Sequence, residues 1–80
     1  MPNPQPQTIQ ELRQTIGENI HRTRKRRKVT LTKLSKQTNI PYQKLDGYEI
    51  GKYELCLVHL LPIANALSVD VKALLRKVNP

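Results

Sequence analysis

The sequence lacks tryptophan and phenylalanine and contains a single cysteine, Cys56. A core must therefore be built from leucine, isoleucine, valine and three tyrosines. One cysteine excludes a disulfide within the chain, which favours a reducing compartment, so we expect a cytoplasmic protein. No apolar run approaches the ~20 residues that cross a membrane, and residues 1–7 lack the apolar stretch of a signal peptide.

Acidic residues are also few. Six Asp and Glu stand against 14 Lys and Arg, which gives a formal net charge of +8. A chain this basic favours a polyanionic partner, with nucleic acid first and an anionic membrane surface second. The 80 residues allow one small domain with a modest core, so a second copy would add buried surface.

Patterns typical of enzymes and metal sites are missing. Structural zinc sites need four ligands, and Cys56 with His59 supplies only two, while His21 is far away in the sequence. The two serines have no arrangement of nucleophile and base, and no glycine-rich phosphate loop is present. We therefore expect a protein that is not an enzyme and that has no cofactor and no metal.

Apolar residues recur at helical spacing along the chain, which predicts an all-α fold. Thr8 is expected to cap the first helix, with Glu11 three residues later as in a capping box. The predicted helices are residues 9–26, 31–38, 42–49, a segment within 57–67, and 71–77, the last capped by Asp70. Residues 1–7 contain three prolines and are expected to form a flexible tail, and residues 8–80 a single domain.

Residues 30–52 carry the most informative pattern, two short helices joined by a tight turn. Thr30 caps the first of them, and Asn39 tolerates the left-handed conformation that the turn needs. Ile40 is expected to be buried between the two helices, and Pro41 opens the second, where its missing N–H costs nothing. This is the layout of a helix-turn-helix that inserts its second helix into a DNA groove.

The fourth helix is harder to predict because of Pro62, which removes the hydrogen bond to Val58 and clashes one turn earlier. Either the helix kinks there or it begins near Leu61. Its predicted apolar stripe consists of Leu57, Leu60, Leu61, Ala64 and Leu67. The apolar residues near 57–61 and the last helix are candidates for a dimer surface.

From residue 16 to residue 75 the sequence resembles, without a gap, the lambda repressor/Cro-like (XRE-type) helix-turn-helix family. The resemblance is carried by Ile16, Gly17, Glu18, Ile20, Arg24, Thr30, Leu34, Ile40, Leu45, Tyr48, Glu49, Gly51, Lys52, Leu57, Leu60, Ile63, Ala64, Ala66, Leu67, Val69, Leu74 and Leu75. It implies five helices, the second and third forming the DNA-binding unit. It also implies a structural ion pair between Arg24 and Glu49.

Several residues depart from the family pattern. Leu31 replaces a common phosphate-contacting Gln, and Thr23 replaces a buried leucine. Lys28 replaces a glycine common at the end of the first helix. Gly47 stands where a longer polar side chain is usual, and Asp46 places a negative charge on or beside the DNA-facing surface.

The outward positions of the third helix are the candidate base contacts: Tyr42, Gln43, Lys44, Asp46 and Gly47. The Gln43 amide can pair bidentately with adenine, Lys44 can reach guanine or a phosphate, and Asp46 can accept from a cytosine amine. Gly47 reads no base but permits close approach of the backbone. The candidate phosphate contacts are Thr30, Lys33, Lys52, Arg22, Arg26 and Arg27.

Residues 22–28 hold six cations in seven positions, and cations at the end of a helix also complement its dipole. The combined pattern predicts a sequence-specific regulator of transcription that binds double-stranded DNA, acting as a homodimeric repressor on a palindromic operator. Two alternatives remain open. One is an antitoxin-like protein that binds a protein partner and its own operator. The other is a sequence-tolerant nucleoid or RNA binder.

Overall fold

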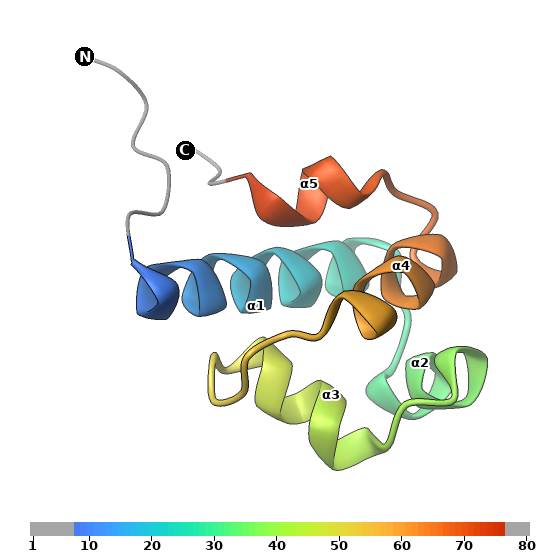
Figure 1. Ribbon diagram of the computed structural model, residues 1–80. Coiled ribbons are helices and arrows are strands. Elements are labelled where there is room, and N and C mark those ends of the chain that lie inside the picture. The colour runs from blue at the N-terminus through green and yellow to red at the C-terminus, as the bar shows by residue number, and fades with distance from the viewer. Residues whose placement is uncertain (1–7, 77–80) are drawn as a thin grey trace.

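The computed structural model describes residues 8–76, which form five helices and no strand (Figure 1). The helices are α1 (Ile9–Arg26), α2 (Leu31–Thr38), α3 (Tyr42–Glu49), α4 (Leu57–Ala66) and α5 (Val71–Leu75). The long α1 lies between α3 on one side and α5 on the other, while α2 and α4 close one end. The all-α prediction is confirmed. The predicted tail, residues 1–7, lies outside the described residues.

Two helices begin at the predicted threonine caps. The Thr8 hydroxyl oxygen accepts from the Glu11 N–H at 3.0 Å and donates to the Glu11 carboxylate at 3.2 Å. The Thr30 hydroxyl accepts from the Lys33 N–H at 3.1 Å. Asp70 precedes α5 as predicted, but its side chain makes no capping hydrogen bond.

The turn between α2 and α3 follows the predicted pattern. Asn39 has φ 61° and ψ 27°, and its N–H donates to the Ser35 carbonyl at 2.8 Å. The Ser35 hydroxyl donates to the Ile40 carbonyl at 2.6 Å, and Ile40 is buried. These bonds fix the angle at which α3 leaves α2.

The core is aliphatic apart from one tyrosine. Its members are Ile16, Ile20, Leu31, Leu34, Ile40, Leu45, Tyr48, Leu60, Ile63, Ala64, Leu67 and Leu74. The Tyr48 hydroxyl lies 2.6 Å from His59 Nδ1, and burial raises the pKa of Tyr48. Tyr48 is thus the one large aromatic side chain in a core without phenylalanine or tryptophan, and its hydroxyl keeps a hydrogen-bond partner.

Gly17 lies where α1 meets the end of α3. A Cβ atom on Gly17 would lie 2.3 Å from the Tyr48 carbonyl oxygen and 2.6 Å from that of Glu49. By helix propensity alone Gly17 weakens α1. Its missing side chain is what lets the backbone of α3 approach so closely.

Two features of the C-terminal half differ from expectation. The helix predicted for residues 71–77 ends at Leu75, because Arg76 is extended with φ −87° and ψ 134°. Asn19 secures this end, since its Nδ2 donates to the Leu74 and Arg76 carbonyls at 2.8 and 2.7 Å. Lys77 lies outside the described residues.

The helix α4 begins at Leu57 and continues through Pro62, so a start near Leu61 is wrong. Leu57 and Leu61 are 78% and 58% exposed, so the predicted stripe is buried only at Leu60, Ala64 and Leu67. Leu57 and Leu61 are one turn apart on a side of α4 that the other described elements leave uncovered. Among residues 8–76, no helix is long and apolar enough to cross a bilayer.

Candidate nucleic-acid interface

An ion pair between Arg24 and Glu49 joins α1 to the end of α3. Arg24 Nε donates to Glu49 Oε2 at 2.6 Å and Nη2 donates to Oε1 at 3.0 Å. The two side chains are 9% and 5% exposed, and Arg24 also donates to the Val29 carbonyl at 2.9 Å. The hydrogen bond with Glu49 raises the pKa of Arg24 above its ordinary value. The structure thus contains the predicted pair, and it sets the position of α3.

His21 also belongs to this cluster, a role that was not predicted from the sequence. Its Nδ1 lies 2.8 Å from Glu49 Oε1, and the imidazole is about half exposed. His21 precedes Arg24 by three residues, so both lie on one face of α1. This spacing of three residues is the signal in the sequence from which the position of His21 beside Arg24 could have been predicted.

The other side of α3 is exposed. Tyr42, Gln43, Lys44 and Asp46 are all exposed, as predicted, and we call them the recognition face. Leu45 and Tyr48 point the opposite way into the core. The helix therefore presents four polar side chains to solvent while its apolar side fixes its rotation.

Gly47 does not belong to the recognition face, so the outward position predicted for it is wrong. It is buried, and a Cβ atom there would lie 2.2 Å from Cδ2 and 2.3 Å from Cε2 of the Tyr53 ring. The chain after α3 folds back and lays this ring against Gly47. The helical period of α3 carries no information about the path of that loop.

The end of α3 also places Lys52. The Lys52 N–H donates to the Gly47 carbonyl at 2.8 Å and the Gly51 N–H to the Tyr48 carbonyl at 3.2 Å. With Gly51 at φ 75°, this is a Schellman ending. The Nζ atoms of Lys44 and Lys52 then lie 5.0 and 5.4 Å from the centre of the Tyr53 ring.

Thr30 and Lys33 are exposed in the first turn of α2. The free N–H groups of a helix start give this region a partial positive charge. Both positions remain available for the phosphate contacts predicted for them.

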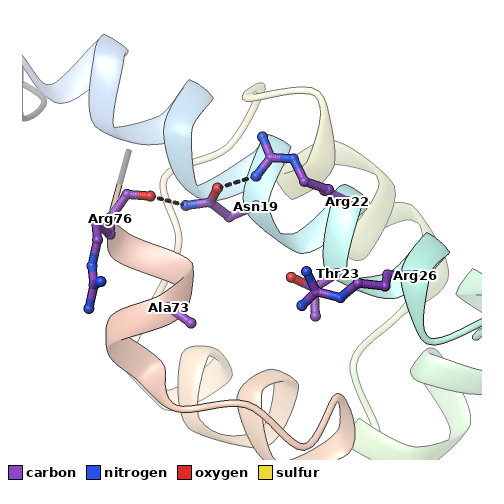
Figure 2. A pocket seen from close by; sticks show the side chains of 6 residues that line it. All are labelled: Asn19, Arg22, Thr23, Arg26, Ala73 and Arg76. Atoms are coloured by element: carbon purple, nitrogen blue, oxygen red, sulfur yellow. Dashed lines mark hydrogen bonds between the residues drawn. The ribbon is translucent and has the colours of Figure 1, made fainter. Parts of the chain in front are cut away.

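Three other predicted phosphate contacts lie elsewhere. Arg22 and Arg26 line a pocket of about 250 Å³ with Asn19, Thr23, Ala73 and Arg76, on the α5 side of α1 (Figure 2). Arg27 Nη2 donates to the Ser68 carbonyl at 3.3 Å, in the connection that leads to α5. Arg22 also lines a second cavity with His21 and Glu49, where α1 meets the end of α3. No described hydrogen bond or cavity joins any of the three arginines to the recognition face.

This arginine cluster has a structural explanation. Both α1 and α5 end beside the pocket, and helix ends carry partial negative charge that cations offset. Asn19 links α1 to the end of α5, because its Nδ2 donates to the carbonyls of Leu74 and Arg76. Its Oδ1 accepts from Arg22 Nη1 at 2.9 Å. Thr23, at the position of a usual leucine, is buried beside them.

The comparisons with known proteins agree with this geometry. The family model for the Cro/C1-type helix-turn-helix DNA-binding domain matches residues 19–78. The chain belongs to this family. The match includes α2, α3 and their turn, so DNA binding is the activity that the family assigns to this unit. A search of curated proteins finds no match.

A solved structure with the same fold is the restriction-modification controller protein C.AhdI from Aeromonas hydrophila. The two align with a TM-score of 0.75 and 21% sequence identity, over 78% of this chain and 94% of that one. At this level of identity the likeness establishes the Cro/C1-type fold alone.

Among the described residues, no three His, Cys, Asp or Glu side chains come together to hold a metal ion.

Proposed function

We propose that this Cro/C1-type protein regulates transcription by reading the major groove of double-stranded DNA with the recognition face of α3. The observation that carries the proposal is the contrast within α3. Its inner side is locked by Leu45, Tyr48 and the Arg24–Glu49 pair, while its outer polar side is exposed. A rigid helix with exposed polar side chains is what groove recognition requires.

Within this proposal each side chain of the recognition face has a role that follows from its chemistry. Gln43 is the main base-reading residue, because a carboxamide offers a donor and an acceptor that match adenine. Asp46 accepts from a cytosine amine and disfavours other bases at that position. Tyr42, half exposed at the start of α3, packs on a thymine methyl or donates to a phosphate.

Phosphate contacts are proposed for Thr30, Lys33 and Lys52, which flank α3 at the start of α2 and in the following loop. Such contacts set the register of the protein on the duplex and carry no sequence information. Arg22, Arg26 and Arg27 are left out because no described cavity or hydrogen bond joins them to the recognition face. Gly47 is left out because Tyr53 covers it.

We further propose that the protein acts as a homodimer. Leu57, Val58 and Leu61 on α4 are 78%, 74% and 58% exposed, an apolar area that a second copy would cover. A two-fold dimer would place two copies of α3 on half-sites about 10 base pairs apart and so favour a palindromic operator. The structurally similar C.AhdI is a restriction-modification controller protein, which supports a regulatory role, and repression is the simplest such role.

The decisive experiment is selection of bound duplexes from a random DNA pool, with sedimentation of the protein alone. We expect an enriched palindrome and a dimer that Leu61→Lys dissociates. If selected and random duplexes compete equally at moderate salt, specific recognition is excluded. The sequence-tolerant alternative then holds, with residues 22–28 as its charged segment.

A further inference from the structure

The loop between α3 and α4 places Tyr53 beside the recognition face, at a position to which the proposed function gives no role. Its ring meets the buried Tyr48 ring edge to face, with centroids 6.5 Å apart and planes at 87°. Tyr48 is 2% exposed, whereas Tyr53 is 37% exposed. One side of the Tyr53 ring is thus anchored to the core and another remains open.

Gly47 provides the space for this ring. The position of a Cβ atom at residue 47 lies within 2.3 Å of two Tyr53 ring carbons, so any side chain there would displace the ring. Gly47 stands where the family usually has a longer polar residue. The unusual glycine and the tyrosine six residues later therefore form one packing arrangement.

The same ring gathers two cations. Lys44, from α3, and Lys52, from the loop, place their ammonium groups 5.0 and 5.4 Å from its centre. An ammonium within about 6 Å of an aromatic ring is attracted by the ring's electron-rich face. Among residues 8–76, neither lysine forms a salt bridge with a carboxylate. Both charges therefore remain available to an anionic partner.

We propose that Tyr53 is a positioning residue for DNA binding, holding Lys44 and Lys52 together as one phosphate-binding pair at the end of α3. The proposal rests on the DNA binding proposed above and extends it. Two like charges near one ring repel each other, and a DNA phosphate beside them would relieve that repulsion. Lys44 is thereby assigned to the phosphate backbone and not to guanine, which leaves Gln43 and Asp46 to read bases.

Tyr53 contributes by ordering the lysines before DNA arrives. A free lysine loses rotamer entropy when it docks, and a lysine already held over a ring loses less. We expect Tyr53→Leu to weaken DNA binding about tenfold for both selected and random duplexes, because two side chains lose their order. Tyr53→Phe keeps the ring and is expected to restore the affinity.

The first measurement needs no DNA. In the free protein, ring currents of Tyr53 should shift the side-chain NMR signals of the terminal methylenes of Lys44 and Lys52. The shifts should persist in Tyr53→Phe and disappear in Tyr53→Leu. Unshifted lysines in the wild-type protein would overturn the proposal whatever the DNA results are.

The second measurement is the salt dependence of affinity for each variant. Loss of an organised phosphate contact should reduce the log–log salt slope by up to ~0.9 for each lysine. A merely structural role for Tyr53 would change stability and leave this slope intact. Gly47→Ala provides a second test, because it displaces the ring while all cations are kept.

The outcomes separate the two proposals. If the wild type selects a DNA site, and a folded Tyr53→Leu or Gly47→Ala protein binds it with unchanged affinity and slope, the role of Tyr53 is refuted alone. If the wild type binds no DNA, the proposed function fails, and the role of Tyr53 fails with it. Lys44→Met should remove most of the effect of Tyr53→Leu if the two act together.

Discussion

The two sides of α3 differ sharply in what surrounds them. Its inner side and C-terminal end meet Gly17, the Arg24–Glu49 pair and a Schellman ending, all within hydrogen-bond or packing distance. Its recognition face is exposed, with Tyr42 at 50%. Contacts within the chain constrain the residues on the inner side, whereas the residues on the outer side are exposed and free to meet a partner. Stability should therefore depend on the first and DNA affinity on the second.

The largest effect on stability is expected at the ion pair. Glu49→Ala leaves the Arg24 guanidinium buried without its carboxylate, which should lower the free energy of unfolding by about 3–5 kcal/mol. Urea unfolding measures this. The control is the double variant Arg24→Met with Glu49→Leu, which should regain most of the loss because no buried charge remains. A Glu49→Ala protein as stable as wild type would show that the pair does not hold α3.

Gly17→Ala tests the packing of α1 against α3. Helix propensity alone predicts stabilisation by ~1 kcal/mol, whereas overpacking against two backbone carbonyls costs about 1–3 kcal/mol. Since backbone atoms cannot rotate away, we expect net destabilisation in thermal unfolding. Glu18→Ala, at the neighbouring exposed position, should stay within about 0.5 kcal/mol of wild type. Stabilisation by Gly17→Ala would mean that α3 lies farther away.

On the recognition face, substitutions should alter binding and leave stability nearly unchanged. Gln43→Ala should relax preference at one base pair, with about 1–3 kcal/mol of discrimination lost. Lys52→Ala, the matched control, should weaken all sequences alike. Selection from a random pool with each variant measures both effects. An unchanged motif for Gln43→Ala would place the base-reading residues elsewhere.

The sequence predicts those parts of the molecule that local rules determine. The bounds of α2 and α3 follow from Thr30, Asn39 and Pro41, whose capping and turn preferences act over a few residues. Arg24 and Glu49 lie farther apart in the chain, and their ion pair was predicted from the family resemblance.

What the sequence did not predict depends on how distant segments pack. Gly47 is covered because the loop folds Tyr53 back onto α3, and Arg22 and Arg26 face α5 because of the rotation of α1. Helical periodicity placed Leu57, Leu60 and Leu61 in one apolar stripe of α4, because the three are equally apolar, but only Leu60 of these is buried. These features determine which cations lie near the recognition face. The site was therefore predicted less well from the sequence than the fold.

The smallest effect is expected where α1 ends, a position that shapes the path of the chain into α2 without touching α3. Lys28 has φ 58°, in the left-handed region, at the position where a glycine is common. Lys28→Gly should raise the free energy of unfolding by about 1 kcal/mol, because a Cβ atom disfavours this conformation. Lys28→Ala keeps the Cβ atom and should bring no gain, so the pair separates backbone strain from the loss of charge. Asn39→Gly should change stability far less than Lys28→Gly, although Asn39 has φ 61°, because asparagine tolerates this region. Equal gains at both positions would show that φ alone determines the gain and that the tolerance of asparagine for this region contributes nothing.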